Sequence, residues 1–246
     1  MRTASFIIHL ERAVARKPQV VKLQSALPQP AETLPAVDGS ALDEAQRNAV
    51  FRPALHRPRY PFRLRDAEIG TFLSHRRAWE EIVSRRLDFA LIVEDDIALN
   101  PAEFSCAYDL ARAHVAEHGY VRFPWFAKEA PRLEIARSGS CTLFSPRRTG
   151  LGMLAQLVSR PAAQRLLAAS ETFDRPVDTL LQMHWVTGVR PLVAWPSGVR
   201  EISDRLGGST IAGRKSAVQT IHREIMRPIY RAQIAIHSRF RQERTR

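Results

Sequence analysis

The sequence predicts an α/β protein with a parallel sheet at its centre, and two observations lead to that prediction. Residues 6–10 and 89–93 form short, continuous apolar runs, which are typical of strands buried on both faces. Residues 66–86 carry apolar side chains at the i, i+3, i+4, i+7 spacing of an amphipathic helix and lead into the second run. A helix followed by a buried strand is typical of proteins with parallel sheets, in which strands and helices alternate along the chain. With 246 residues, the chain has room for one such domain and a tail.

Other elements of the first half follow from local signals. Apolar spacing predicts a helix over residues 19–27. The pair Asp38-Gly39 marks a tight turn after a short strand. Residues 51–62 are rich in proline and arginine and predict a loop. Asn100 is a typical helix N-cap, so we expect a helix over residues 101–117.

The second half predicts shorter elements. A helix is expected to begin at Pro161, and residues 177–184 share one helical face, with Asp178 near its beginning. The composition changes at Gly207-Gly208. Strands are expected at residues 120–123, 141–144, 152–158 and 192–195.

From residue 214 onward the sequence predicts a basic amphipathic helix. Its apolar stripe comprises Val218, Ile221, Ile225 and Ile229, and its arginines face elsewhere. Such a helix suits an anionic membrane surface, although the stripe could equally dock on the domain and leave a solvated basic face. We therefore divide the chain into a domain over residues 1–212 and a tail over residues 213–246.

The overall charge narrows the choice of partners. Lys and Arg number 37 against 25 Asp and Glu, giving a net charge of +12, which implies a nucleic acid, an anionic membrane or a phosphorylated substrate. The aromatic residues sit mostly in apolar runs rather than among the basic ones, so we expect no nucleic acid. The N-terminal residues do not form a signal peptide, and we expect a cytoplasmic protein. The two cysteines have no metal-ligand spacing.

Three consecutive acids follow the second apolar run. Glu94, Asp95 and Asp96 cannot stay unpaired in the core, so they are expected where the strand leaves it. In open α/β sheets ligands bind at that end of the strands, and a divalent cation carrying phosphates suits a carboxylate cluster. If the strand stays extended, Glu94 and Asp96 lie on one side and Asp95 on the other. The alternative is a solvated turn before the next helix.

Several segments, taken together, resemble glycosyltransferase family 25, of the bacterial lipooligosaccharide galactosyltransferase type. The resemblance covers residues 5–212 and departs from the family pattern at His9, where such proteins usually carry Asn, and at Thr71. Its most specific parts are residues 68–75 and 90–96. The matching segments are residues 6–12, 36–39, 68–75, 90–96, 157–163, 176–178 and 209–211.

The resemblance implies a GT-A-like single domain around a mixed, mostly parallel sheet. It implies a UDP-sugar donor, commonly UDP-galactose, and a divalent metal, usually Mn²⁺ with Mg²⁺ as the alternative. The reaction would be an inverting transfer to a saccharide acceptor on a lipid-linked core, in lipopolysaccharide or other cell-surface glycan synthesis. A protein of this kind would be cytoplasmic and peripheral on the inner membrane. The rival interpretations are a non-catalytic basic protein that binds membrane or nucleic acid, and a phosphoryl transferase, although no Gly-rich phosphate loop is present.

The resemblance and the residue chemistry also suggest roles. Asp96 is the first metal ligand and Glu94 the second, since a diphosphate-bound metal needs only one or two protein carboxylates. The expected donor-binding residues are Arg12, Arg16, Asp38, Gly39, His75 and Asp95.

The acceptor side has three predicted residues. Inversion needs a base that takes the proton of the attacking hydroxyl, and Asp178 matches a family carboxylate; the alternative is that it caps its helix. His184 and Trp185 are expected to line the acceptor site, because a tryptophan face stacks on sugars, with core packing as the alternative.

Overall fold

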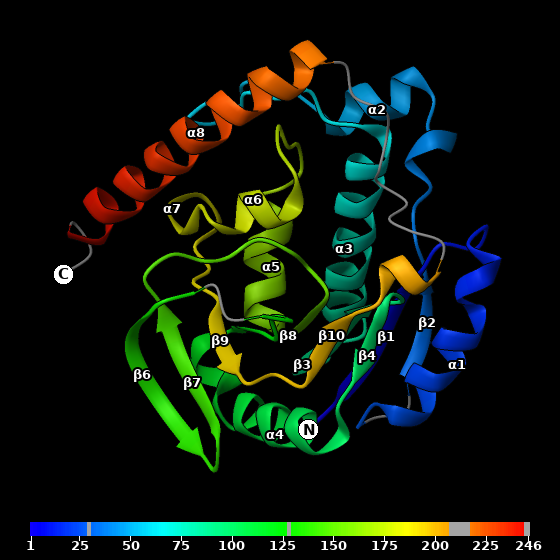
Figure 1. The fold of residues 1–246 in the computed structure, drawn as a ribbon. Coiled ribbons are helices and arrows are strands. Elements are labelled where there is room, and N and C mark those ends of the chain that lie inside the picture. Colours follow the sequence, from blue (N-terminus) through cyan, green and yellow to red (C-terminus); the bar gives the residue numbers. More distant parts are fainter. Residues whose placement is uncertain (29–30, 127–128, 207–216, 244–246) are drawn as a thin grey trace.

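The computed structural model describes residues 1–28, 31–126, 129–206 and 217–243 and shows a mixed sheet between two layers of helices (Figure 1). The sheet has eight strands in the order β2-β1-β3-β8-β5-β9-β7-β6. β8 and β7 run opposite to the other strands, so the sheet is mostly parallel in direction, as predicted. The strands are β1 (Thr3–His9), β2 (Ala31–Pro35), β3 (Phe89–Glu94), β5 (Tyr120–Arg122), β6 (Pro131–Ser138), β7 (Cys141–Pro146), β8 (Ala155–Ser159) and β9 (Leu192–Trp195).

Helices surround this sheet, and a small antiparallel ribbon of β4 (Ile97–Leu99) and β10 (Val199–Glu201) lies beside it. The α-helices are α1 (Lys17–Ala26), α2 (Glu44–Val50), α3 (Asp66–Ser84), α4 (Pro101–His118), α5 (Arg160–Ala168), α6 (Val177–Leu181), α7 (His184–Thr187) and α8 (Ala217–Glu243). Three short 3₁₀ turns complete the description: η1 (Val14–Arg16), η2 (Gly39–Ala41) and η3 (Ser203–Leu206).

The side chains of the central strand β3 pack against helices on both faces of the sheet. Ala90 and Ile92 pack into the core under α3 and α5, whereas Leu91 and Val93 pack into the core under α1 and α4. This alternation is what an extended strand imposes. It places the next residue, Glu94, on the side of α3.

Some boundaries differ from the sequence predictions. The short strand predicted before the turn at Asp38-Gly39 occupies Ala31–Pro35. The predicted helical face over residues 177–184 is divided into α6 and α7. β6 went unpredicted because most of its residues are exposed and it carries no apolar run. The predicted cap Asn100 is confirmed, since its side chain accepts a hydrogen bond from the backbone N–H of Glu103.

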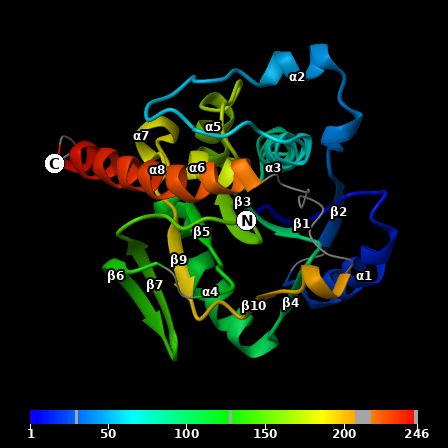
Figure 2. The same cartoon turned by 45° about the horizontal axis from the view of Figure 1, so that its top comes forward.

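The C-terminal helix α8 lies across α6 and α7 (Figures 1 and 2). Tyr230 and Ile234 are its buried residues and pack with Met183. Ile225 and Ile229 of the predicted stripe are instead exposed, at 58% and 45%, so the face that docks on the domain is not the predicted one. The side chains of Val218 and Ile221 lie outside the described ones. Within the described part of the chain, no helix is both long and apolar enough to span a membrane.

Candidate active site

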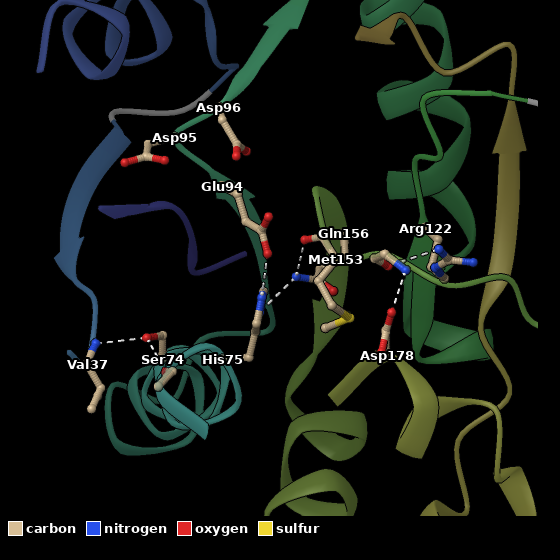
Figure 3. Close-up of polar contacts among 12 residues, drawn as sticks. Val37, Ser74, His75, Glu94, Asp95, Asp96, Arg122, Met153, Gln156 and Asp178 are labelled. Atoms are coloured by element: carbon tan, nitrogen blue, oxygen red, sulfur yellow. Dashed lines mark hydrogen bonds and ion pairs between the residues drawn. The ribbon is translucent and has the colours of Figure 1, made fainter. Parts of the chain in front are cut away.

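The acidic run sits where β3 ends. The strand stops at Glu94, and Asp95 and Asp96 form the turn into β4. The predicted alternation of side chains therefore ends at Glu94, and the three carboxylates have different surroundings. Figure 3 shows Glu94 pointing toward His75 of α3, whereas Asp95 and Asp96 lie past the strand end.

Asp95 is buried and bound by two basic side chains. Nδ1 of His9 lies 2.6 Å from its Oδ2, and a guanidinium nitrogen of Arg16 donates to its Oδ1 at 2.6 Å. The same nitrogen of Arg16 lies 3.1 Å from Oδ2 of Asp96. Because both oxygens of Asp95 already have protein partners, its predicted role in binding donor hydroxyls would require one of these contacts to be shared or exchanged.

Asp96 carries one carboxylate oxygen without a partner. Its Oδ1 is buried and makes no hydrogen bond with the described residues. Burial, and after it repulsion from Glu94, raises the pKa of Asp96 to about 7. A bound divalent cation would satisfy that oxygen and offset the repulsion between the carboxylates, so these residues fit the metal predicted from the sequence.

The protein alone does not surround such an ion. Among the described residues, no group of three or more His, Cys, Asp or Glu side chains is arranged to hold a metal. A metal at Asp96 would take the rest of its ligands from water and phosphate, as Mg²⁺ does in many phosphate sites.

Glu94 lies at the partly exposed end of a chain of hydrogen bonds that the sequence did not predict. Nε2 of His75 lies 3.1 Å from Oε1 of Glu94, and the side-chain amide of Gln156 lies 3.1 Å from Nδ1 of His75. The hydroxyl of Tyr120 donates to Oε1 of Gln156. With the amide donating to Nδ1, the proton of a neutral imidazole is on Nε2 and points to Glu94. No sequence signal links these residues, because they come from four separate elements.

A hollow of about 110 Å³ brings together all eight residues predicted for donor and metal binding. Asp38 lies at its edge, where Nε of Arg12 is 2.5 Å from Oδ2 and the hydroxyl of Ser40 donates to Oδ1 at 2.6 Å. The hydrogen bond from Ser40, helped by Arg12, lowers the pKa of Asp38. The lining residues include Arg12, Arg16, Asp38, Gly39, His75, Glu94, Asp95 and Asp96.

Gly39 has a structural function that the sequence did not indicate. A Cβ at this position would lie 1.8 Å from the carbonyl oxygen of Asp66 and 2.9 Å from the amide nitrogen of Gly70. Gly39 therefore allows η2 to pack directly against α3. Its predicted contact with the donor stays a prediction.

A second, larger cleft of about 480 Å³ adjoins the hollow. Thr71 and Glu94 line both, so they form the boundary between the two. Asp178 lies in the larger cleft, where its Oδ2 accepts a hydrogen bond from the backbone N–H of Gly152 at 2.9 Å and its Oδ1 accepts one from Thr179 at 3.2 Å. One oxygen of the predicted base is thus held by the backbone.

His184 and Trp185 lie elsewhere. They line a different pocket, beside Arg132 and Arg190. Nε2 of His184 is 3.3 Å from the hydroxyl of Ser238, and the ring of Trp185 stacks on that of His237 at 5.9 Å between centroids. Burial lowers the pKa of His184 to about 4. The structure does not bring these two residues to the cleft of Asp178, and their predicted contact with the acceptor stays a prediction.

Comparison with known proteins assigns the family. The model of glycosyltransferase family 25 (LPS biosynthesis protein) matches residues 2–181. The chain therefore belongs to glycosyltransferase family 25, as the resemblance had indicated.

Individual relatives match over shorter stretches. A glycosyltransferase 25 family member of Drosophila pseudoobscura is 37% identical over 99 residues, which is 39% of this chain and 16% of the relative. Human procollagen galactosyltransferase 2 is 34% identical over 95 residues, which is 37% of this chain and 15% of the relative. The aligned stretches thus span about a sixth of the length of these relatives.

Among solved structures, a Drosophila β1,4-galactosyltransferase 7 mutant in complex with manganese, UDP-Gal and xylobiose is 9% identical, with a TM-score of 0.44; the match covers 91% of this chain and 80% of the other.

Proposed function

We propose that this protein is a metal-dependent, inverting glycosyltransferase that moves galactose from UDP-galactose to a saccharide acceptor. The observation that carries the proposal is the junction of two hollows at Glu94 and Thr71. The smaller hollow holds the basic and acidic residues expected for a sugar nucleotide, and the larger cleft holds Asp178, a carboxylate that forms no ion pair with a described residue. A glycosyltransferase needs a donor site and an acceptor site that share a border, so that the sugar is transferred directly from the donor to the acceptor hydroxyl.

On the donor side, Arg12 and Arg16 supply positive charge for the diphosphate, and Asp38 can accept hydrogen bonds from the nucleoside. Arg16 already bridges Asp95 and Asp96, so it holds the acidic turn in place. The name of the human relative, a galactosyltransferase, supports galactose as the sugar.

Asp96 and Glu94 are the residues that would hold a divalent metal, Mn²⁺ or Mg²⁺. The metal would supply positive charge to the leaving diphosphate. The unpartnered Oδ1 of Asp96 supports this assignment.

On the acceptor side, we assign Asp178 as the base that takes the proton from the attacking hydroxyl. The hydrogen bond from Gly152 fixes one carboxylate oxygen, and fixing a base in one orientation reduces the entropy lost on reaching the transition state. Trp125 is 46% exposed in the same cleft and offers an aromatic face to a sugar ring.

The cellular setting is also part of the proposal. The acceptor would be a lipid-linked saccharide in lipopolysaccharide or other cell-surface glycan synthesis, and the protein would be cytoplasmic and peripheral on the inner membrane. Residues 1–212 would form the transferase domain and residues 213–246 a tail that completes its cleft. The exposed Ile225, Ile229 and Ile236 recur on one side of α8 and, together with the chain's net charge of +12, suit an anionic membrane.

Donor binding tests the proposal most directly. We would measure thermal shift and calorimetry with UDP-, GDP-, ADP- and CMP-sugars, with Mn²⁺ or chelator. Donor at ~100 times its dissociation constant should stabilise the fold by about 2.7 kcal/mol. We expect a response to a UDP-sugar that requires metal and is lost in Asp96→Ala but kept in the surface variant Asp109→Ala. No response to any sugar nucleotide would favour the alternative, a non-catalytic basic protein that binds membrane.

A further inference from the structure

The larger cleft has two arginines on one side that the proposed chemistry does not use. Arg227 and Arg231 of α8 both line this cleft. They are four residues apart, so they project from the same side of the helix. The carboxylates Glu94 and Asp178 line the cleft from β3 and α6.

Buried contacts hold α8 at the cleft. The fully buried guanidinium of Arg175 donates to the hydroxyl of Tyr230 at 2.6 Å. Ile234 is buried to 1% exposure and packs with Met183. Because Tyr230 lies between the two cleft arginines in sequence, this anchor also fixes where Arg227 and Arg231 are presented.

The charge of these arginines is not neutralised locally. Arg227 makes one ion pair, a 3.9 Å contact with the exposed Glu224, and exposed pairs of this kind contribute little. Arg231 makes no ion pair with any described residue. Four carboxylates line the cleft: Glu68 is paired with Arg65 and Glu94 with His75, whereas Asp178 and Glu201 form no ion pair with a described residue. Among the described residues, no cleft carboxylate lies within ion-pair distance of Arg227 or Arg231, so two guanidinium groups face the cleft without a close anionic partner.

We propose that Arg227 and Arg231 form an anion subsite for a phosphate group on the saccharide acceptor. Two guanidinium groups match the nearly double negative charge of a phosphate monoester better than the single charge of a carboxylate. The inference rests on the proposed function in that it treats this cleft as the acceptor side. The chain would then act on a saccharide that an earlier phosphorylating step has already modified.

A lipid surface is the other source of phosphate, and the geometry of α8 argues against it for these two residues. The exposed isoleucines Ile225, Ile229 and Ile236 are spaced four and seven residues apart, which defines a separate side of the helix. That side faces away from the buried Tyr230 and Ile234. A membrane that contacts the isoleucines would approach α8 from the side opposite the cleft.

The test compares matched sugars on the full chain with the donor side filled by UDP and Mn²⁺. Galactose 6-phosphate, galacturonic acid and galactose would be titrated by calorimetry at low salt into wild type, Arg227→Gln/Arg231→Gln and Arg112→Gln. Arg112 is the matched control, because it also forms an exposed ion pair three residues away, with Asp109 at 3.8 Å. Vesicles of phosphatidylcholine, with and without phosphatidylglycerol, form a separate arm.

We expect the sugar phosphate to bind at least about tenfold more tightly than galactose. This preference should disappear in the double variant and persist in Arg112→Gln. Equal binding of the three sugars by wild type, or a preference that survives in the double variant, would overturn the inference. So would loss of phosphatidylglycerol binding in the double variant without any sugar-phosphate preference, because the arginines would then serve a membrane.

UDP binding is measured first in the same samples, which separates this inference from the proposed function. If UDP binds and the phosphate preference is missing, only the anion subsite is wrong. If UDP does not bind, the proposed function fails, and the sugar titrations without UDP still decide whether the arginines bind phosphate.

Discussion

Nε2 of His75 lies 3.1 Å from Oε1 of Glu94, and this contact joins the middle of α3 to the end of β3. Strand alternation turns Glu94 toward α3, and the helical spacing of Ile69, Phe72 and Trp79 buries the face of α3 that carries His75. The apolar packing of one layer thus orients a polar residue at the border of the two hollows.

Removing the imidazole should affect both stability and the donor side. His75→Ala leaves Glu94 and the amide of Gln156 without a partner and opens a cavity at a position with no exposed surface. We expect the free energy of unfolding to fall by about 2–4 kcal/mol and affinity for UDP-sugar to weaken. Denaturant titration and calorimetry measure the two effects. His114→Ala, on the outer part of α4, is the control and should change neither.

Asp96→Asn should stabilise the metal-free protein. Because the pKa of Asp96 is raised to about 7 in the folded state, its ionisation opposes folding. In chelator, wild type should lose stability relative to the variant as the pH rises from about 4 to about 7, by a few kcal/mol. Thermal unfolding across this pH range measures the difference.

The neighbouring acid supplies the control for that prediction. Asp95→Asn weakens the contacts to His9 and Arg16 in a buried setting, so it should destabilise the protein at pH 7. If both variants shifted stability in the same direction, the different environments assigned to Asp95 and Asp96 would be wrong.

Gly39→Ala should destabilise the fold. The added methyl group would lie 1.8 Å from the carbonyl oxygen of Asp66, so η2 and α3 must move apart, at a cost of about 1–3 kcal/mol or more. Gly139→Asn is the control: the site has open space within 4 Å and a φ of +52°, which Asn tolerates. Chemical denaturation compares the two, and an equal loss would contradict the close approach.

Tyr230→Phe should loosen α8. The change removes an acceptor from the buried guanidinium of Arg175, which costs about 1–3 kcal/mol. We expect faster amide hydrogen exchange in α8 and a lower thermal midpoint. Ile225→Ala, on the exposed side of the same helix, should leave both unchanged. Protection that is identical in wild type and Tyr230→Phe would show that this hydrogen bond does not anchor the helix.

Asp178→Asn should separate binding from transfer. The amide cannot take the proton of the acceptor hydroxyl, so we expect kcat to fall by about 10²–10⁴-fold with unchanged affinity for UDP-sugar. Steady-state transfer assays and donor calorimetry measure the two quantities. Asp109→Asn on α4 is the control, and retention of full kcat in Asp178→Asn would assign the base to another residue.

The sequence by itself determined the elements and the region of the site. Apolar periodicity predicted α3, a continuous apolar run predicted β3, and Asn100 predicted the start of α4, because these signals act between residues close in the chain. The run Glu94, Asp95, Asp96 indicated where the candidate site lies, because carboxylates cannot remain unpaired in the core.

Only the tertiary structure decided which partners each of the three acids has. Asp95 meets His9 across 86 residues of sequence, and Glu94 meets a histidine that Gln156 holds from 81 residues away. It also decided that His184 and Trp185 face α8 and that Tyr230, rather than the Ile225 stripe, docks the tail. Contacts of this kind depend on how whole elements pack against one another, and local sequence patterns do not predict that packing.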